Sequence, residues 1–321
     1  MKVGIIGGAG YTAGELIRIL IYHPNVEIKF VHSTSNANNP ITTVHRNLIG
    51  ESDFVFTDNE DFNSVDVVFL CLGHGESKKY LEKNDIPTNV KIIDLSQDFR
   101  IKNDSHNFVY GLPEANREQI KLANRIANPG CFATAIQLAA LPLFSHSLIT
   151  DDLHITGITG STGNGQKLVD TVHFSWRTNN ISVYKPFEHQ HLNEITQTFK
   201  EFQPEFKKQI NFIPIRGNFT RGIFVTCYTK CELDINRLHE LYETYYKSHP
   251  FVYICNETVD LKLVVNTNKC FLQVEKVDDK IFITSVIDNL IKGASGQAVQ
   301  NMNLMFGIDE KSGLNLKPVA F

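Results

Sequence analysis

A glycine-rich turn between a short apolar strand and an amphipathic helix opens the chain and most constrains its fold. Residues 2–6 are typical of a buried strand, residues 7–10 are Gly-Gly-Ala-Gly, and the helical pattern that follows ends near Pro24. The glycines would let the backbone approach a pyrophosphate, and the helix N-terminus would stabilise its charge. A second apolar strand, residues 26–31, follows at β-α-β distance. Together these features favour a dinucleotide-binding unit over a purely structural glycine turn.

The residues after the second strand indicate which dinucleotide is bound. In an NAD-binding unit an Asp or Glu usually holds the ribose 2′-hydroxyl here, but residues 32–36 are His-Ser-Thr-Ser-Asn. Hydroxyl and amide donors suit a 2′-phosphate better than a carboxylate does, so the sequence predicts NADP, used as NADPH. The residues expected to contact the cofactor are Gly7, Gly8, Gly10, Tyr11, Thr12, Ala13, Ser33, Ser35, Ser96 and Asn289.

Two patterns of hydrophobicity divide the chain into an α/β half and an α+β half. Near-continuous apolar runs at 66–72 and 90–95 are typical of parallel strands covered on both faces, which predicts a doubly wound parallel sheet of the Rossmann type. Beyond residue 148 the strand-like segments alternate apolar and polar residues, which favours a mostly antiparallel sheet. The expected strands there are 153–158, 223–229 and a hairpin of 271–277 with 281–287, and the expected helices are 166–176, 191–202 and 235–247.

The same patterns set the predicted domain boundaries. Residues 1–130 should form the NADP-binding domain, and residues 131–294 should form a domain for catalysis, substrate binding and oligomerisation. From Ser295 the apolar positions follow helical spacing as far as Gly307, and glycine is a common C-terminal cap. We expect this last segment, 295–321, to return to the first domain and complete it.

The segment Asn-Pro-Gly-Cys-Phe-Ala-Thr, residues 128–134, contains the strongest candidate for a nucleophile. The Ala-rich run after Cys131 has helical spacing and stops at Pro142, so the cysteine should lie at a helix N-terminus. The unpaired N–H groups and the positive end of the helix dipole favour thiolate over thiol at that position. The alternative is a buried cysteine that packs as a small apolar side chain.

Two histidines in the segment 184–195 are candidates for the proton transfers that such a nucleophile needs. His191 and Glu194 are three residues apart at the start of a predicted helix, so they share a face and the carboxylate can orient the imidazole. The predicted catalytic set is Cys131, His191 and Glu194, with His189 contacting substrate. The two histidines would also suit zinc, but without a clear third ligand we expect no metal. Solvent exposure of both is the other alternative.

Two loops offer groups for the anionic part of a substrate. Arg100 lies in a polar loop after a predicted parallel strand, where α/β proteins place ligand sites, although a surface pair with Asp98 would explain it equally well. Ser161 belongs to the glycine-rich loop 160–165, which follows a predicted strand. This loop can present amide N–H groups to a phosphate or serve as a simple turn.

Composition argues against several classes of protein. The 321 residues carry 31 Lys and Arg against 35 Asp and Glu, a net charge of −4, without the basic cluster expected for nucleic-acid binding. No apolar run approaches the roughly 20 residues that span a bilayer, and the chain opens on a strand rather than a signal peptide. The six cysteines lack the spacing of a zinc site or a disulfide framework. We expect a cytoplasmic enzyme for a small molecule, and a homo-oligomer, either dimer or tetramer.

Seven segments, in order along the chain, resemble one enzyme family. They are GGAGYTAGEL at 7–16, DLSQDFR at 94–100, YGLPE at 110–114, NPGCFAT at 128–134, HQHLNEI at 189–195, FTRGI at 219–223 and DNLIKGASGQAVQNMN at 288–303. This ordered set is similar to the N-acetyl-γ-glutamyl-phosphate reductases of arginine biosynthesis. The related aspartate-semialdehyde dehydrogenases, which share the architecture, are the second choice. The chain differs from the family's usual pattern in having Phe132-Ala133 in place of Tyr-Pro and in lacking an arginine after the second strand.

The resemblance implies a reaction and roles for particular residues. The reaction is NADPH-dependent reduction of N-acetyl-L-glutamyl 5-phosphate to the 5-semialdehyde and phosphate, through a thioester on Cys131. His191 matches the family's acid/base, and Arg100 or Arg221 would hold a substrate carboxylate or the leaving phosphate. The N-acyl cap, acetyl or succinyl, is left open by the sequence. So are two other classes of protein: a cysteine hydrolase that uses Cys131 and His191, and a non-catalytic nucleotide sensor.

Overall fold

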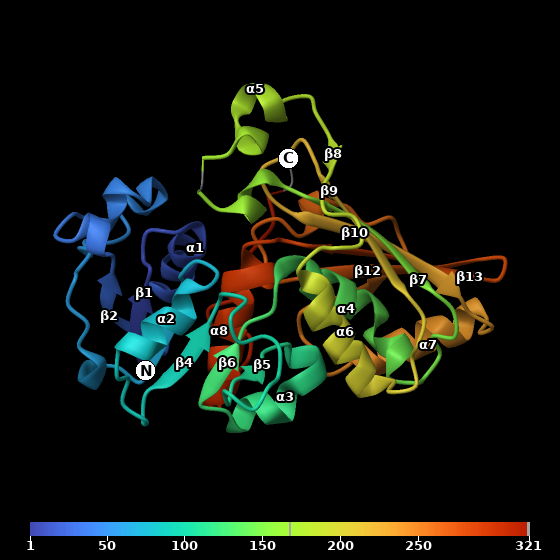
Figure 1. Ribbon diagram of the computed structural model, residues 1–321, viewed down its shortest axis with the longest axis horizontal. Helices are drawn as coiled ribbons and strands as arrows, with labels where there is room; N and C mark the ends of the chain where they lie inside the picture. Colours follow the sequence, from blue (N-terminus) through green and yellow to red (C-terminus); the bar gives the residue numbers. More distant parts are fainter. Residues whose placement is uncertain (167, 320–321) are drawn as a thin grey trace. The chain divides into compact units, whose positions relative to one another are not determined.

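The chain folds into two compact units. The computed structural model describes residues 1–166 and 168–319 (Figure 1). The first unit comprises Met1–Pro129 and Ala294–Asn315, and the second comprises Gly130–Gly293 and the described residues from Leu316 onward. The sequence assigned all of 295–321 to the first domain, which is wrong for the tail. There the Asn266 side chain donates a hydrogen bond to the Lys317 carbonyl oxygen at 3.1 Å, so the tail packs with the second unit.

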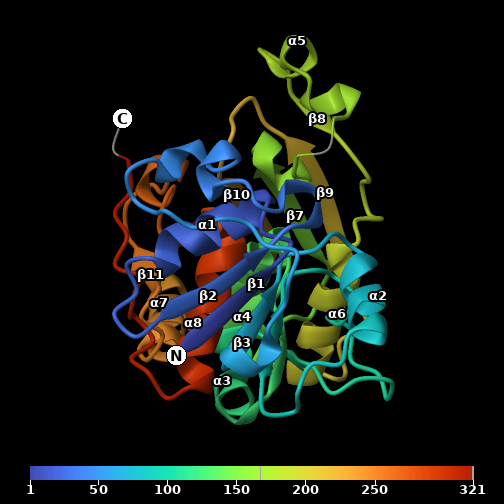
Figure 2. The same cartoon turned by 90° about the vertical axis from the view of Figure 1, so that its left-hand side faces the viewer.

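The first unit contains a six-stranded sheet in which every neighbouring pair is parallel. The strand order is β2-β1-β3-β4-β6-β5, and Figure 2 shows β2, β1 and β3 side by side. The chain leaves β1 for one side of the sheet and later continues on the other, so the order reverses between β1 and β3, and open α/β sheets bind ligands at such a point. The strands are β1 (Lys2–Ile6), β2 (Glu27–His32), β3 (Val67–Leu70), β4 (Lys91–Asp94), β5 (Val109–Tyr110) and β6 (Arg125–Ala127). The doubly wound sheet predicted from the apolar runs is confirmed.

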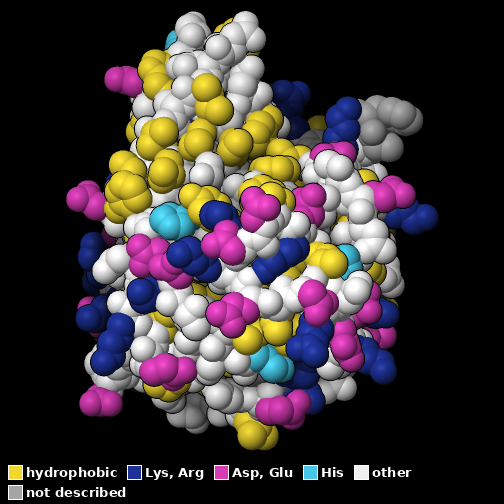
Figure 3. Space-filling view, turned by 90° about the vertical axis from the view of Figure 1, so that its right-hand side faces the viewer, with side chains coloured by type: hydrophobic (Ala, Val, Ile, Leu, Met, Phe, Trp, Pro, Cys, Tyr) yellow, Lys and Arg dark blue, Asp and Glu magenta, His cyan; other side chains and the backbone are white. Residues whose placement is uncertain are grey.

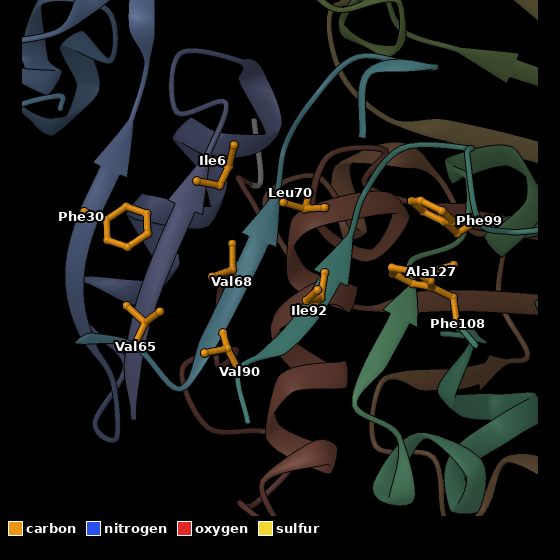
Figure 4. Packing of buried hydrophobic residues seen from close by; sticks show 10 residues of the cluster. All are labelled: Ile6, Phe30, Val65, Val68, Leu70, Val90, Ile92, Phe99, Phe108 and Ala127. Carbon is orange, nitrogen blue, oxygen red and sulfur yellow. The ribbon is translucent and has the colours of Figure 1, made fainter. Parts of the chain in front are cut away.

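Helices pack on this sheet against apolar side chains that come from alternate positions of its strands and so point to the same face. Figure 4 shows one cluster of buried side chains, including Ile6, Val68 and Ile92, and Tyr80 and Leu81 of α2 pack against it. Helix α8 lies against both α1 and α3. The helices of this unit are α1 (Tyr11–Leu20), α2 (Glu76–Lys83), α3 (Pro113–Leu122) and α8 (Gly296–Met305). The predicted return of the last helix to the first unit is therefore seen for α8.

The second unit contains a seven-stranded mixed sheet that is mostly antiparallel. Its order is β11-β12-β13-β10-β7-β9-β8, and only the β11–β12 and β7–β9 pairs are parallel. The predicted hairpin is present as β12 and β13. The strands are β7 (Leu153–Thr159), β8 (Ser182–Val183), β9 (Ile210–Arg216), β10 (Ile223–Lys230), β11 (Val252–Cys255), β12 (Cys270–Val277) and β13 (Lys280–Ile287).

One face of the second sheet is covered by helices, and the other is partly exposed. Helices α4, α6 and α7 contact the sheet, and β7 alternates strictly between buried and half-buried residues. Strand β10 shows the same alternation, with Tyr228 exposed. The helices are α4 (Cys131–Phe144), α5 (Phe174–Arg177), α6 (His191–Phe202) and α7 (Ile235–Tyr246). The predicted helix 191–202 is thus confirmed at both ends.

Two predictions about helices are wrong. The expected helix at 166–176 is replaced by two short turns, Asp170–Val172 and α5, and Lys167 lies outside the described residues. Leu168 and Phe174 are 99% and 78% exposed, so the segment has no apolar surface on which to pack a helix.

Pro142 does not end α4, which continues to Phe144. A proline at this position cannot donate to the carbonyl oxygen of Leu138. That oxygen instead accepts a hydrogen bond from the Tyr246 hydroxyl at 2.5 Å, and the Ala139 oxygen accepts one from Tyr242 at 2.6 Å. Helix α7 therefore satisfies the group that the proline leaves unpaired, and the helix can pass through position 142.

Candidate active site

Cys131 is the first residue of α4, as the turn-and-helix pattern predicted. Gly130 precedes it with an extended backbone (φ −72°, ψ 153°), and no side chain caps the helix. The first N–H groups of a helix have no partner within it, and the dipole places positive charge at that end. A negative charge on the Cys131 sulfur would therefore be stabilised by the helix.

Cys131 also differs from the other cysteines in its surroundings. Burial raises the pKa of Cys71 and of Cys227 to about 12, so both remain thiols near neutral pH. Cys255, which is half-buried like Cys131, has its pKa raised by burial and by Glu257. The remaining two, Cys231 and Cys270, are buried. Of the six, Cys131 alone combines partial exposure with a helix N-terminus, which argues against the reading of a buried structural cysteine.

The backbone of Gly293 lies against Cys131. A Cβ built on Gly293 would be 2.8 Å from the Cβ of Cys131, closer than two such atoms approach. Gly293 belongs to a π-helical turn, Ile291–Ser295, and its N–H donates to the Asp288 carbonyl oxygen at 2.9 Å. Single π-helical turns are frequent at functional sites. A residue with no side chain is needed here so that Cys131 can keep its place.

Two buried histidines pack beside the residue that follows Cys131. The ring centroids of His189 and His191 are 4.7 Å apart, and they lie 5.7 Å and 6.5 Å from the ring of Phe132. His189 is 4% exposed and His191 is 6% exposed. The alternative that both imidazoles face solvent is therefore wrong, and Phe132 forms part of the wall around them.

Glu194 connects the helix that carries His191 with the turn before Cys131. Its Oε1 atom lies 3.9 Å from His191 Nε2, and its Oε2 atom accepts a hydrogen bond from the Gly130 N–H at 3.0 Å. The carboxylate is itself buried. Glu194 thus places negative charge beside one imidazole and holds the backbone from which α4 begins.

His189 is neutral near pH 7. Its pKa is lowered to about 4, chiefly by burial and then by the positive charges of Lys185 and Arg216. Its Nδ1 atom accepts a hydrogen bond from the His191 N–H at 3.3 Å, which leaves the proton on Nε2. A neutral imidazole of this kind can donate one hydrogen bond to a substrate oxygen.

In the first unit, the glycine turn after β1 leaves room where a pyrophosphate is expected. Gly7 has φ +78°, a conformation that favours glycine. A Cβ on Gly8 would be 2.4 Å from a methyl carbon of Val31, so this glycine packs against β2. Around Gly10 a Cβ would meet nothing closer than 3.9 Å, and Gly10 is the uncapped N-terminus of α1. Tyr11, Thr12 and Ala13 form the first turn of α1, so the predicted dinucleotide contacts lie together and fit the phosphates.

The other residues predicted to contact the cofactor lie in two loops. After β2, the Asn36 amide donates to the hydroxyl oxygens of Ser33 and Ser35, at 3.1 Å and 3.0 Å. After β4, the buried Ser96 hydroxyl donates to Asp94 at 2.7 Å. Burial raises the pKa of Asp94 to about 6. Ser33 and Ser35 therefore belong to one polar group, whereas the Ser96 side chain is engaged within its own loop.

A separate cleft in the first unit does not suit a dinucleotide. It has a volume of about 630 Å³, and its charged lining residues are Glu27, Glu51 and Asp53. Three carboxylates would repel the phosphates of a nucleotide. The glycine turn remains the better candidate for the cofactor site.

Within the described part of the chain, no helix has the length and apolar character needed to cross a bilayer. Over residues 1–166 and 168–319, no three side chains of His, Cys, Asp or Glu are grouped to hold a metal ion. His189 and His191 therefore have no third ligand in that part of the chain.

Comparison with known proteins identifies the family. Residues 2–123 match the model of the semialdehyde dehydrogenase NAD binding domain, and residues 131–289 match that of the semialdehyde dehydrogenase dimerisation domain. An N-acetyl-gamma-glutamyl-phosphate reductase from Parabacteroides distasonis is 57% identical over 321 residues, which cover all of both chains. Proteins of the same name from Phocaeicola vulgatus and Bacteroides fragilis are 56% identical over the same extent. The chain belongs to this reductase family.

Solved structures show the same fold in a related family. Aspartate semialdehyde dehydrogenase II from Vibrio cholerae has a TM-score of 0.73 at 16% identity, and the enzyme from Candida albicans, crystallised with NADP, has 0.73 at 14%. Each likeness covers 95% of this chain and 98% of the other. The second choice from the sequence thus shares the architecture, whereas high identity over the full length belongs to the reductases. The first unit binds a nicotinamide cofactor, in agreement with the family model.

Arg100 is buried, so a surface ion pair does not explain it. Its Nε donates to the Asn128 carbonyl oxygen at 2.9 Å and its Nη2 donates to the Leu95 oxygen at 3.1 Å. These contacts tie the loop after β4 to the segment that leads to Cys131. The predicted contact of Arg100 with substrate stays a prediction.

In the second unit, the predicted ligand residues Arg221 and Asn289 each form hydrogen bonds with other residues of the protein. Arg221 Nε donates to the buried carboxylate of Asp288 at 2.7 Å. The Asn289 amide accepts from the Gly222 N–H at 2.7 Å and donates to the Thr162 hydroxyl at 3.0 Å. These two bonds use one N–H and one lone pair of the Asn289 amide, and its contact with nicotinamide stays a prediction. Ser161 begins the short 3₁₀ turn Ser161–Asn164 next to Thr162.

The sequence prediction was incomplete for two features of the second unit. The small residues of the segment 288–297 predict close backbone contact, but the sequence does not show that Gly293 meets Cys131. Arg177 and Arg216 had no usable signal, because they are isolated in the sequence and Arg177 lay next to a wrongly predicted helix.

Proposed function

We propose that this chain catalyses the NADPH-dependent reduction of N-acetyl-L-glutamyl 5-phosphate to N-acetyl-L-glutamate 5-semialdehyde and phosphate, a step of arginine biosynthesis. The observation that carries the proposal is the half-buried Cys131 at the start of α4, with two buried imidazoles beside the next residue. The chain is related over its whole length to reductases with this name. A cytoplasmic location stays a prediction from the sequence.

Cys131 acts as the nucleophile in the proposed mechanism. Its thiolate attacks the C5 carbonyl carbon of the acyl phosphate, a C–S bond forms, and the C–O bond to phosphate breaks. Phosphate leaves and a thioester remains on the sulfur. The turn Gly7–Gly10 and the first residues of α1 would hold NADPH, which would supply the hydride needed to bring this carbon to the aldehyde level. Collapse of the tetrahedral species breaks the C–S bond and returns the thiolate.

The two histidines and Glu194 are proposed to stabilise the negative charge that develops on the substrate oxygen. His191, with the Glu194 carboxylate 3.9 Å from its Nε2, is the proposed acid/base that hydrogen-bonds the oxyanion and exchanges a proton with it. His189, neutral because of its lowered pKa, is the proposed hydrogen-bond donor to the substrate. Arg100, Arg221 and Ser161 are proposed to hold the phosphate or a substrate carboxylate.

NADP rather than NAD is the proposed cofactor. Ser33, Ser35 and Asn36 form a polar group after β2 that can donate to a 2′-phosphate. Glu60, which comes from another loop, has its Oε1 atom 3.1 Å from His32 Nε2, so its carboxylate contacts that imidazole. Comparing NADPH with NADH in the assay below tests this choice.

The exposed face of the second sheet is the proposed surface between copies of the chain. Alternate residues of β7 and β10 are half-buried or exposed and share one face of the sheet. Figure 3 shows hydrophobic side chains gathered in the upper part of one face of the molecule, with charged groups below. The match of residues 131–289 to a dimerisation domain supports an assembly. A dimer or tetramer is expected by light scattering, and a monomer at micromolar concentration would contradict it.

The reaction is tested most directly in reverse. The protein is mixed with NADP, phosphate and N-acetyl-L-glutamate 5-semialdehyde, and formation of NADPH is followed by absorbance. Cys131→Ser should lower the rate by about 10⁴-fold or more, because the covalent step is lost, while NADPH binding is kept. Cys255→Ser, which changes the other half-buried cysteine, should leave the rate near that of the wild type.

Different results separate the competing functions. A cysteine hydrolase would release phosphate from the acyl phosphate without any cofactor, and a nucleotide sensor would bind NADPH without turnover. Near wild-type turnover by Cys131→Ser would contradict the covalent mechanism. Rapid-quench mass spectrometry should show an acyl adduct on wild-type protein that is missing from Cys131→Ser.

A further inference from the structure

Two arginines meet at one end of the second sheet without a carboxylate partner. Arg216 is the last residue of β9, where it pairs with Thr159 at the end of β7 and with Ser182 of β8. Arg177, the last residue of α5, extends its Nη2 to the Thr159 carbonyl oxygen at 3.4 Å. Among the described residues, neither guanidinium forms an ion pair with Asp or Glu.

Arg177 is the more unusual of the two, because it is buried with most of its donors unused. Its side chain is 7% exposed, and its Nε and Nη1 atoms have no hydrogen-bond partner in the described structure. The Asn218 amide, oriented as its neighbours require, donates to the Arg177 carbonyl oxygen and accepts from the Asn179 N–H, both at 3.1 Å. Burial of an unpaired charge is costly unless a partner binds it. The position of Arg177 therefore indicates an anionic ligand.

Arg216 is held in place by an aromatic ring. Its guanidinium carbon lies 4.1 Å from the centroid of the Tyr184 ring, and the Tyr184 N–H donates to the Pro214 oxygen at 3.1 Å. Such stacking fixes the plane of the guanidinium and leaves its edge free to form two parallel hydrogen bonds. Burial, and then repulsion by the positive charge of Arg216, lower the pKa of Arg177.

The pair lies next to the proposed catalytic groups. The Tyr184 ring is 5.6 Å from the His189 ring, and His189 is 5.7 Å from Phe132, which directly follows Cys131. Burial, and then the charges of Lys185 and Arg216, lower the pKa of His189. Burial, and then the charge of Cys131, raise the pKa of Tyr184. A series of contacts through Tyr184 and His189 therefore leads from Arg216 to Phe132, the residue after Cys131. Phosphate leaves from the carbon that the sulfur attacks, so the arginines are placed for a more distant anionic group of the same substrate.

We propose that Arg177 and Arg216 bind a carboxylate of the substrate and thereby decide which capped glutamyl compounds are accepted. This inference rests on the proposed function. A planar carboxylate can accept two parallel hydrogen bonds from one guanidinium and face the second. The carboxylate is either the α-carboxylate that every such substrate carries or one at the end of a dicarboxylic acyl cap. The chemistry is the same, and the experiment distinguishes the two positions.

The test uses three aldehydes in the reverse reaction with the full-length protein. They are N-acetyl-L-glutamate 5-semialdehyde, its α-carboxamide, and the N-succinyl compound with both carboxylates. Arg177→Met and Arg216→Met should each raise KM about 100-fold for the substrate whose carboxylate they bind, with kcat changed much less. Arg177→Lys keeps the positive charge but not the paired N–H donors of a guanidinium. Its KM should therefore lie between those of the wild type and Arg177→Met. Arg237→Met, at an exposed position on α7, should match the wild type.

The pattern across substrates decides the position. If the α-carboxylate is bound, the wild type loses affinity for the α-carboxamide and the two variants lose nothing further with it. If a cap carboxylate is bound, the wild type prefers the N-succinyl compound and the variants lose that preference. Equal losses for all three aldehydes, or a raised KM for phosphate alone, would overturn the proposal.

Binding measurements keep this inference separate from the proposed reaction. N-Acetyl-L-glutamate and N-succinyl-L-glutamate are titrated by calorimetry into wild type, Arg177→Met and Arg216→Met, after equal melting temperatures show that each is folded. If no aldehyde turns over but one ligand binds and both variants lose it, the proposed function fails and the carboxylate site stands. If the variants bind both ligands as the wild type does, the carboxylate site is wrong even when the reaction is found.

Discussion

Two helices of this protein begin in the same way but differ in what surrounds their first turn. Helix α1 starts after Gly10 and helix α4 starts after Gly130. Both glycines have an extended backbone, with φ −78° and ψ 166° at Gly10 and φ −72° and ψ 153° at Gly130, and neither helix has a side-chain cap. Each helix therefore leaves its first N–H groups and its positive dipole end for another partner.

The surroundings of the two turns fit two different partners. A Cβ on Gly10 would find no atom closer than 3.9 Å, so a diffusible ligand can approach that backbone. Around Cys131, Gly293 lies in close contact and Glu194 binds the Gly130 N–H at 3.0 Å. A covalent nucleophile needs a fixed position more than it needs space. The comparison teaches that the packing around a helix N-terminus decides whether it serves a bound anion or a side chain of the protein.

Of the changes that test this comparison, a negative charge at Gly10 should have the largest effect. Gly10→Asp and Gly10→Asn should both fold, because the extended backbone at this position suits either residue and both can cap α1. Only Asp brings a negative charge to the place where phosphates are expected. We expect NADPH to bind about 100-fold more weakly to Gly10→Asp than to Gly10→Asn, since like charges about 4 Å apart repel by several kcal/mol near a protein surface. Titration calorimetry measures this ratio.

Comparing Gly10→Asp with Gly10→Asn separates the effect of a negative charge from the effect of side-chain shape. Both variants should keep the melting temperature of the wild type or raise it slightly, since a cap is added. Equal affinities for Asp and Asn would show that the phosphates bind away from Gly10. The open space around Gly10, in contrast to the close packing around Cys131, would then not explain how α1 binds the cofactor.

A smaller effect is expected from adding one methyl group at Gly293, which packs against Cys131. In Gly293→Ala the new Cβ would be 2.8 Å from the Cβ of Cys131, so one backbone must move. Displacing a reacting group by a fraction of an ångström should lower kcat about 10-fold, with NADPH affinity unchanged. Steady-state kinetics and the rate at which iodoacetamide alkylates Cys131 measure the displacement. Unchanged kcat and alkylation would mean that the contact with Gly293 does not position Cys131.

Local patterns were enough to predict the elements that carry the site. Helix α6 was predicted at both ends because its apolar residues fall on one face and that face is buried, as at Ile195 and Phe199. Cys131 was placed at a helix start because turn and helix are adjacent in sequence. In contrast, residues 166–176 show a helical pattern but Leu168 is 99% exposed, so no packing stabilises a helix there. A pattern predicts a helix only where the fold supplies a partner surface.

The contacts that complete the site depend on pairing between distant strands, which the sequence does not reveal. Arg216 meets Arg177 because β9 pairs with both β7 and β8 in one register. A shift of one residue would turn the Arg216 side chain to the other face of the sheet. Likewise, nothing near Pro142 shows that the Tyr246 hydroxyl will occupy the Leu138 carbonyl oxygen.

The smallest effect concerns the free energy of unfolding at acidic pH. It should depend on a histidine near the turn before Cys131 and not on the turn at Gly10. His189 is buried against Phe132, and its pKa is about 4 in the folded protein against 6.5 for a free histidine. Between these pH values the unfolded chain binds a proton that the folded chain does not, so stability falls as the pH decreases from 6.5 to 4. His189→Asn should remove up to about 3 kcal/mol of this loss, because one pKa unit corresponds to roughly 1.4 kcal/mol.

The measurement is the free energy of unfolding by urea at several pH values between 4 and 7. The slope against pH should be shallower for His189→Asn than for the wild type, by up to one proton in this range. The same substitution at the exposed His146 is the matched control. If His189→Asn has the wild-type slope, His189 binds its proton equally well in the folded and the unfolded chain. Below the ordinary histidine pKa of about 6.5 it would then be a positive group near Cys131, and its charge would add to that of the start of α4 in stabilising a thiolate.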